Sequence, residues 1–155
     1  MGTGKYQFTR LLRIMDIVAG EISERVVFQI GFTTYIPKNG EWFRFETIKQ
    51  FKKRIESSRV IVSHGGAGSI IHTLVAAKPL IVFPRSKKYG EKLDEASVEL
   101  AEALKNEKLI YVTNDTDNLK RLLLDKDLQI GKVNNEERHI LQCVITAFLK
   151  QIANV

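Results

Sequence analysis

The stretch that decides the fold is Val60-Ile61-Val62-Ser63-His64-Gly65-Gly66-Ala67-Gly68-Ser69, and an apolar segment follows it as far as Ala77. Residues 60–62 are β-branched and apolar, as is typical of a buried strand of a parallel sheet. The glycines permit a sharp turn. From Ser69 the spacing of apolar residues predicts a helix that ends before Pro79. A strand, a glycine-rich turn and a helix in this order are typical of α/β proteins.

The same alternation of strands and helices continues on both sides of this stretch. Helices are predicted at about residues 6–23, 47–57, 94–104, 117–124 and 136–152, with Thr47 as an N-cap. Strands are predicted at about residues 26–30, 42–45, 80–83 and 109–112. Trp42 and Phe43 are expected in the core, and contact with a partner is their alternative role. We therefore predict one domain, residues 1–155, built on a Rossmann-like parallel sheet with helices on its faces.

The bulk composition is that of an ordinary globular domain. The chain has 155 residues, of which 44% are hydrophobic and 27% charged. No apolar run reaches the roughly 20 residues of a membrane span, and the N-terminus lacks a signal-peptide core. The single cysteine, Cys143, cannot form an internal disulfide. The sequence therefore predicts a soluble, cytoplasmic protein.

The formal charge of +6 admits an anionic partner. The basic residues fall into separate clusters at 49–54, 85–88 and 120–121. No zinc-finger, helix-turn-helix or aromatic RNA-binding motif accompanies them. We therefore expect no nucleic-acid partner.

The glycine turn suits a phosphate group. Gly65, Gly66 and Gly68 let an anion approach the backbone, and the first amides and the dipole of the following helix favour negative charge there. Ser69 is placed to cap the helix or to donate to a phosphate oxygen. The pattern is not a Walker A loop, and Ile71 occupies the place of the third glycine of a dinucleotide fingerprint. A phosphate site and a tight turn without a ligand therefore both remain open.

The wider segment from His64 to Arg85 closely resembles the C-terminal domain of glycosyltransferase family 28. The resemblance extends through Gln29-Ile30-Gly31 and Glu99-Leu100-Ala101, and it covers roughly residues 2–112. Within that family the chain is most similar to the small soluble donor-binding subunits of split GT-B glycosyltransferases. These include the catalytic subunit that adds the second GlcNAc in N-glycan synthesis and the accessory subunits of exopolysaccharide glucuronosyltransferases.

This resemblance implies one half of a GT-B fold and an inverting transfer of a hexose-type sugar from a UDP-sugar, such as UDP-GlcNAc, to a lipid-linked acceptor. It also implies a heteromer, in which a membrane-anchored partner subunit binds the acceptor. The chain would then be peripheral at the cytoplasmic face of a membrane and active only with its partner. No cofactor and no metal are expected, because a helix dipole and basic groups stabilise the departing diphosphate. The alternative is a non-catalytic relic that only stabilises the partner.

The resemblance also gives candidate site residues. His64 is a candidate catalytic base, and fixing the loop through backbone contacts is its alternative role. The residues expected to bind the UDP-sugar are Gly65, Gly66, Ala67, Gly68, Ser69, His72, Arg85, Asp94, Glu95, Gly2 and Thr3. His72 stands where many relatives carry a ribose-binding glutamate, and packing is its alternative role. Arg85 is expected to meet a phosphate or the partner.

Relatives tend to carry an Asp-His-Gln or Asp-Gln cluster at the start of the next helix, where this chain has Asp94-Glu95-Ala96-Ser97. Asp94 and Glu95 would bond sugar hydroxyls, and Asp94 is equally explained as a helix N-cap. The replaced His and Gln leave the sugar less well defined than the UDP.

The start of the chain also departs from the family pattern. Family chains usually open with an apolar strand that runs into a Gly-Thr turn, whereas this sequence opens with Met1-Gly2-Thr3-Gly4. The first strand is therefore expected to be missing, either because the start has been set too late or because a partner strand fills the gap. Gly2 and Thr3 would then lie near the diphosphate.

Overall fold

The structure is a computed structural model that describes residues 6–92 and 94–130. The candidate residues Gly2 and Thr3, the predicted helix at 136–152 and Cys143 lie outside the described residues. Within the described ranges, no helix combines the length and the apolar character that crossing a membrane requires.

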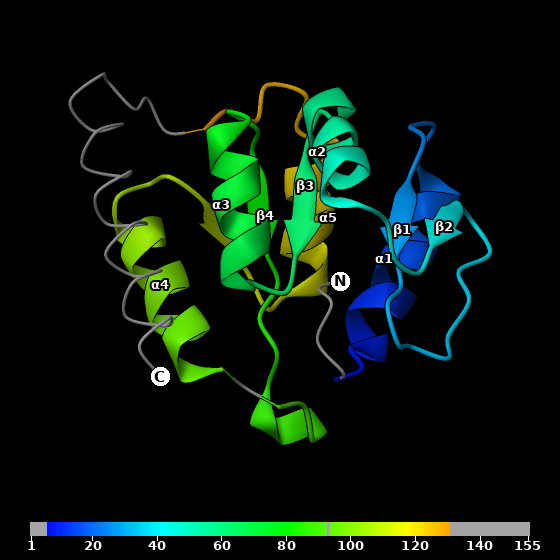
Figure 1. The fold of residues 1–155 in the computed structure, drawn as a ribbon, viewed down its shortest axis with the longest axis horizontal. Coiled ribbons are helices and arrows are strands. Elements are labelled where there is room, and N and C mark those ends of the chain that lie inside the picture. Colours follow the sequence, from blue (N-terminus) through cyan, green and yellow to red (C-terminus); the bar gives the residue numbers. More distant parts are fainter. Residues whose placement is uncertain (1–5, 93, 131–155) are drawn as a thin grey trace.

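Helices and strands alternate along the described chain (Figure 1). The helices are α1 (Thr9–Glu21), α2 (Ile48–Ser57), α3 (Ala67–Val75), α4 (Glu95–Asn106) and α5 (Thr116–Leu124), with a 3-10 turn η1 (Lys87–Tyr89). The strands are β1 (Val27–Gln29), β2 (Glu41–Phe43), β3 (Ile61–Ser63), β4 (Leu80–Val82) and β5 (Tyr111–Val112). Each of these helices and strands overlaps a predicted range, which confirms the α/β prediction.

Every strand pair is parallel, and the strands form two separate ladders. β1 pairs with β2, and β3, β4 and β5 pair in that order. From the sequence we expected the first strand to be missing, and no ladder joins β1 to β3 in the part of the chain that the structure describes. Because hydrogen bonding requires strands about 4.8 Å apart, the cavity that lies between β1 and β3 accounts for the break.

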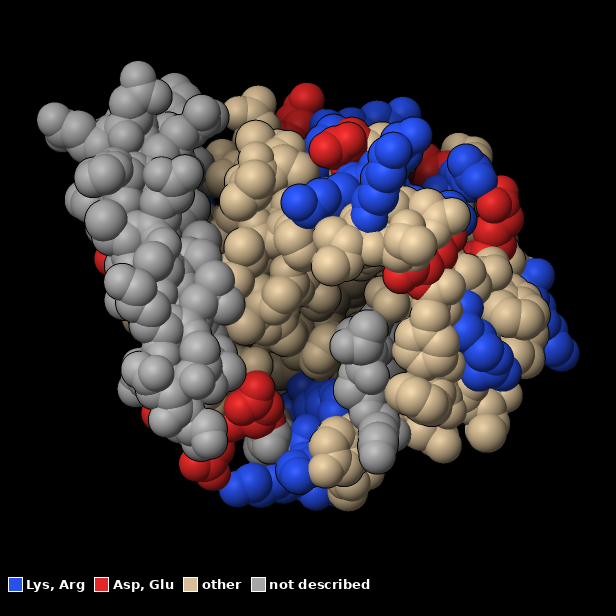
Figure 2. Space-filling model, viewed as in Figure 1, with Lys and Arg blue, Asp and Glu red and all other residues tan. Residues whose placement is uncertain are grey.

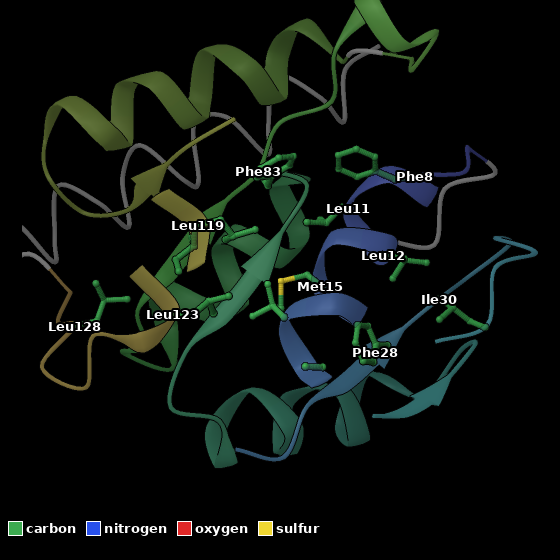
Figure 3. Packing of buried hydrophobic residues seen from close by; sticks show 13 residues of the cluster. Phe8, Leu11, Leu12, Met15, Phe28, Ile30, Phe83, Leu119, Leu123 and Leu128 are labelled. Carbon is green, nitrogen blue, oxygen red and sulfur yellow. The ribbon is translucent and has the colours of Figure 1, made fainter. Parts of the chain in front are cut away.

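The hydrophobic core lies on both faces of β4. Ile81 and Phe83 face one cluster with α1, β1 and α5, while Leu80 and Val82 face a second cluster with α3 and α4. Figure 3 shows the first cluster, which brings together Leu11 and Met15 of α1 with Leu119 and Leu123 of α5. Because successive side chains of a strand point to opposite faces, a run of four apolar residues, each 0% exposed, makes β4 the central strand.

The ends of the helices follow from local sequence. The Thr47 hydroxyl accepts a hydrogen bond from the Gln50 amide, and the Gln50 side chain accepts one from the Thr47 amide, so the predicted N-cap of α2 is confirmed. Helix α3 begins at Ala67 rather than at the predicted Ser69. The prediction that Trp42 is buried was wrong, because β2 is an edge strand and leaves Trp42 44% exposed.

Helix α3 ends in a conformation that favours glycine at position 77. Ala77 has a φ of 51°, and the amides of Ala77 and Lys78 donate to the carbonyls of Leu74 and Thr73. We expect Ala77→Gly to raise the free energy of unfolding by about 1 kcal/mol, because glycine adopts this conformation without a clash of Cβ. We expect Ala76→Gly, at a φ of −77°, to lower it by about 0.5 kcal/mol. Urea denaturation of both variants checks this, and equal effects at the two positions would contradict it.

Candidate functional site

The candidate site lies at the carboxyl edge of β3 and β4. The glycine turn follows β3, and the basic loop, residues 85–92, follows β4. Because β3 and β4 are neighbours and parallel, both segments emerge at the same edge, which is where α/β sheets bind ligands. In Figure 2 the surface is hollowed near the middle of this face, and Lys and Arg side chains gather below the hollow, where Figure 1 places the basic loop.

The glycine turn uses its glycines in three different ways. Gly65 has a φ of 96°, a conformation that L side chains rarely adopt, and a Cβ there would meet Val82 Cγ1 at 3.1 Å. A Cβ at Gly66 would lie 2.8 Å from His64 Nε2. A Cβ at Gly68 would meet no atom within 4 Å. Gly65 is therefore required by the turn itself, Gly66 leaves room for the His64 ring, and Gly68 leaves open space at the start of α3.

The N-terminus of α3 offers free hydrogen-bond donors. Helices α2 and α5 have N-caps, Thr47 and Asp115, whose side chains accept from backbone amides, whereas α1, α3 and α4 have no capping side chain among the described residues. The N-cap of α3 is Gly66, and within the described residues α3 has neither a capping side chain nor an acidic residue in its first turn. Its first amides therefore lack side-chain partners at the positive end of the helix dipole, which suits an anion.

His64 directly follows β3 and is neutral at physiological pH. Burial is the largest cause that lowers its pKa to about 4; the positive charge of Arg85 also lowers it, and Asp94 opposes the shift. Its Nδ1 atom is buried and has no hydrogen-bond partner within the described ranges. Since Nε2 is the nitrogen close to Gly66, the neutral ring presents a group that can accept a proton at the glycine turn.

Arg85 begins the basic loop, and only some of its hydrogen-bond donors have partners among the described residues. Its Nη2 donates to the Tyr6 carbonyl at 3.0 Å and its Nη1 to the Lys92 carbonyl at 3.4 Å. Its Nε is buried without a partner among the described residues. Burial lowers the pKa of Arg85, and Glu91 opposes this effect. A buried polar atom without a hydrogen-bond partner costs free energy. His64 Nδ1 and Arg85 Nε are two such atoms, and they belong to the residues that follow β3 and β4 at the carboxyl edge of the sheet.

An ion pair that the sequence analysis missed holds the basic loop in place. Arg10 Nε and Nη2 donate to the two oxygens of Glu91 at 3.0 and 2.8 Å, and Nη2 also donates to the Pro84 carbonyl at 3.0 Å. Glu91 accepts a further bond from the Ser86 amide at 2.8 Å. Arg10 and Glu91 are 81 residues apart, and no local pattern in the sequence signals such a pair. Glu91 therefore fixes the loop that carries Arg85 against α1.

We expect Glu91→Gln to lower the free energy of unfolding by about 2 kcal/mol, because it leaves the largely buried Arg10 charge without its carboxylate. The matched control is Glu102→Gln, whose exposed pair with Lys105 should contribute less than about 0.5 kcal/mol. Urea denaturation of the two variants at pH 7 measures the difference. Equal losses would show that the Arg10 contact does not hold the loop.

The remaining candidates, His72, Asp94 and Glu95, interact with residues outside the glycine turn. The His72 ring packs against Phe51 of α2, with ring centroids 5.9 Å apart, and burial and then Lys52 lower its pKa. Among the described interactions, no hydrogen bond or ring contact joins His72 to the glycine turn. Asp94 is the N-cap position of α4, but its carboxylate accepts from the Ser97 hydroxyl and not from a backbone amide. Glu95 is exposed and lies 3.8 Å from Lys87.

No group of three or more His, Cys, Asp or Glu side chains that could hold a metal ion occurs in residues 6–92 and 94–130. Within these ranges the candidate site consists of the glycine turn, the start of α3, His64 and Arg85. Asp94 also belongs to it, because its charge acts on the pKa of His64.

Comparison with known proteins gives a family and two relatives. Residues 12–153 match the model of the glycosyltransferase family 28 C-terminal domain. The chain is 33% identical over 95 residues to the UDP-N-acetylglucosamine transferase subunit ALG13 of Homo sapiens, a match that covers 57% of this chain and 8% of that protein. It is 27% identical over 151 residues to the protein of the same name from Yarrowia lipolytica, a match that covers 85% of this chain and 75% of that protein. The chain thus spans only a small part of the human relative.

Proposed function

The chain belongs to the family of the glycosyltransferase family 28 C-terminal domain, and from this premise we propose that it is the donor-binding subunit of a two-component glycosyltransferase. The donor is a UDP-sugar, and the names of both relatives favour UDP-N-acetylglucosamine. The acceptor is lipid-linked and is bound by a membrane-anchored partner subunit. This chain supplies one wall of the cleft, works at the cytoplasmic face of the membrane, and transfers sugar only with its partner.

The uncapped start of α3 supports the donor proposal most strongly. The glycines leave its first amides open to a diphosphate, and the helix dipole favours the negative charge. His64 and Arg85 add polar groups at the ends of the adjacent strands. Gly65, Gly66, Ala67, Gly68 and Ser69 would therefore surround the diphosphate.

In the proposed reaction, an acceptor oxygen forms a bond to the anomeric carbon as the bond from that carbon to the UDP oxygen breaks. Attack from the opposite side inverts the configuration. The amides of α3 and the Arg85 charge would stabilise the negative charge that develops on the departing UDP, so no metal is needed in this scheme. His64 is neutral at pH 7 and would take the acceptor proton on Nε2.

The other candidates complete the donor site in this proposal. Asp94 and Glu95 would bond sugar hydroxyls, because they begin α4 at the same edge of the sheet. His72 would reach a ribose hydroxyl only if its ring left Phe51, so a packing role is favoured for this residue. Gly2 and Thr3 would lie near the diphosphate.

Calorimetry with UDP, UMP and UDP-N-acetylglucosamine tests the donor site. We expect UDP to bind at least about tenfold more tightly than UMP, because the second phosphate adds the charge that the helix start stabilises. No binding of UDP would overturn the proposal. A transfer assay with a co-expressed membrane partner then separates a catalytic subunit from a partner-stabilising relic, since the relic would support no transfer.

A further inference from the structure

The Glu91 carboxylate is held by a guanidinium from outside the basic loop. Arg10 Nε and Nη2 donate to its two oxygens at 3.0 and 2.8 Å, so the pair is bidentate. The Ser86 amide donates at 2.8 Å to the same oxygen as Arg10 Nη2. The Glu91 side chain is only 9% exposed. A carboxylate this deeply buried needs a cationic partner, because an unpaired charge away from water is costly.

The Arg10 side chain is itself fixed by aromatic rings. Its guanidinium carbon lies 5.2 Å from the centroid of the Phe8 ring, 4.9 Å from that of Phe83 and 4.6 Å from that of Tyr89. Phe8 and Phe83 are fully buried, and Figure 3 shows both in the core beside α1. These cation–π contacts favour one position of the guanidinium. The position of the Glu91 carboxylate is therefore set by α1 and the core.

A second guanidinium lies close to the same carboxylate. Arg85 Nη1 donates at 3.4 Å to the carbonyl of Lys92, the residue after Glu91. The amide that donates to Glu91 belongs to the residue after Arg85. The Arg85 guanidinium carbon also lies 5.5 Å from the centroid of the Phe8 ring, which the first guanidinium contacts as well. Burial lowers the pKa of Arg85 and the charge of Glu91 raises it, so the two charges interact across space.

Glu91 nevertheless pairs with only one of the two guanidinium groups. It forms an ion pair with Arg10, and none of the ion pairs among the described residues joins it to Arg85. Within the same ranges the hydrogen bonds of Arg85 go to backbone carbonyls, which do not cancel its charge. A carboxylate would cancel that charge, and it would use the same fork of N–H donors that a phosphate uses. Glu91 and an anionic ligand are therefore competitors for Arg85.

We propose that Arg10 is a positioning residue of the donor site, which binds Glu91 and so keeps this carboxylate from pairing with Arg85. Without Arg10, the buried carboxylate turns to Arg85 and competes there with the diphosphate. This inference deepens the proposed function and rests on it, because Arg85 stabilises the charge of UDP in that proposal. It differs from a purely structural role, in which the ion pair only anchors the basic loop. The two roles predict opposite results for a double variant.

Calorimetry with UDP tests the proposal on the full chain, as wild type, Arg10→Gln, Glu91→Gln and the double variant. Arg10→Gln should weaken UDP at least about tenfold, because Glu91 then pairs with Arg85. Glu91→Gln should stay within about threefold of wild type, because it removes the competing charge. The double variant should recover to within about threefold of wild type, whereas loss of a structural anchor is not repaired by removing its second half.

A second measurement follows Arg85 without a ligand. Its Nε–H resonance, assigned by its loss in Arg85→Lys, is recorded by heteronuclear NMR in the absence of UDP. We expect the resonance to shift in Arg10→Gln, as the carboxylate approaches, and to return toward its wild-type position in the double variant. Glu102→Gln, at the exposed ion pair with Lys105, is the matched control and should change neither the resonance nor the affinity for UDP.

Arg10→Gln leaves a buried carboxylate without its partner, so circular dichroism has to establish that this variant is folded. Where it is not, Arg10→Lys takes its place, because lysine keeps the positive charge but cannot bind both oxygens as a planar fork. Arg10→Lys should weaken UDP at least about threefold, and adding Glu91→Gln should restore the affinity.

Two results would overturn the proposal. Wild-type affinity in Arg10→Gln, with an unmoved Arg85 resonance, would show that Glu91 does not turn to Arg85. A double variant that binds UDP as weakly as Arg10→Gln would show that the pair only anchors the loop. Failure of the wild type to bind UDP would contradict the proposed function instead, and the Arg85 resonance would still decide whether Arg10 keeps Glu91 away from it.

Discussion

Replacing Gly66 with valine should weaken UDP binding by at least about 100-fold, or roughly 3 kcal/mol. A Cβ at this position would lie 2.8 Å from His64 Nε2 and 3.0 Å from Cε1. The two further methyl groups of valine would fill the space around the first turn of α3. The substitution should therefore displace His64 and cover the amides that would hold the diphosphate. Calorimetry with UDP measures the loss.

Two matched variants make this result specific. Gly68→Ala adds a methyl group where no atom lies within 4 Å, so it should leave the fold intact and weaken UDP by about tenfold if the diphosphate occupies that space. Ala77→Gly, at the opposite end of α3, should leave UDP affinity unchanged. Circular dichroism establishes that each variant is folded. Wild-type affinity in Gly66→Val would rule out the glycine turn as the diphosphate site.

Lowering the pH from 7 to 4.5 should remove about 2 kcal/mol of stability through His64. Its pKa in the folded protein is about 4, below the ordinary value of 6.5. The unfolded chain therefore binds a proton at a pH where the folded chain does not. The stability from the neutral buried ring is complete above pH 6.5, falls as the pH drops toward 4, and changes no further below that.

Urea denaturation between pH 4.5 and 7 measures this effect. His64→Gln should flatten the pH dependence, because the glutamine does not titrate. His72→Gln is the matched control, since its ring is less buried and packs against Phe51 away from the turn, and it should keep most of the slope. Asp16, whose pKa lies below the ordinary value for aspartate, titrates outside this window. An unchanged slope in His64→Gln would show that the buried ring does not control acid stability.

Local patterns were enough to predict most of the fold. The β-branched run before the glycine turn and the alternation around it predicted β3, α3 and β4, because both features depend on nearby residues. The start of α3 was predicted two residues too late. Glycine has a low helix propensity, so Gly68 was not expected in the helix, but it lies in the first turn of α3. The exposure of Trp42 depends on which strand lies at the edge of the sheet. Strand order depends on contacts between distant parts of the chain, so the residues around Trp42 do not predict it.

The candidate site was predictable only in part. His64, the glycine turn and Arg85 emerge at one edge because they follow neighbouring parallel strands, and the alternation of strands and helices predicted a parallel sheet. The Arg10–Glu91 pair joins α1 to the basic loop across 81 residues, so no spacing rule reveals it. The gap between β1 and β3 agrees with the missing first strand that the start of the sequence led us to expect.

The break between β1 and β3 also bears on how the molecule opens. The unit of α1, β1 and β2 is joined to β3, β4 and β5 by side-chain packing and by side-chain hydrogen bonds such as those of Arg10, and in the described residues no strand ladder crosses the boundary. A boundary without backbone bonds separates cooperative units, so the α1–β1–β2 unit is expected to detach at lower free energy than global unfolding requires. Such an opening carries Arg10 away from Glu91 and releases the basic loop. In a cell, a protease that cuts exposed backbone would then cleave this domain faster when the α1–β1–β2 unit is detached than when it is packed against the rest.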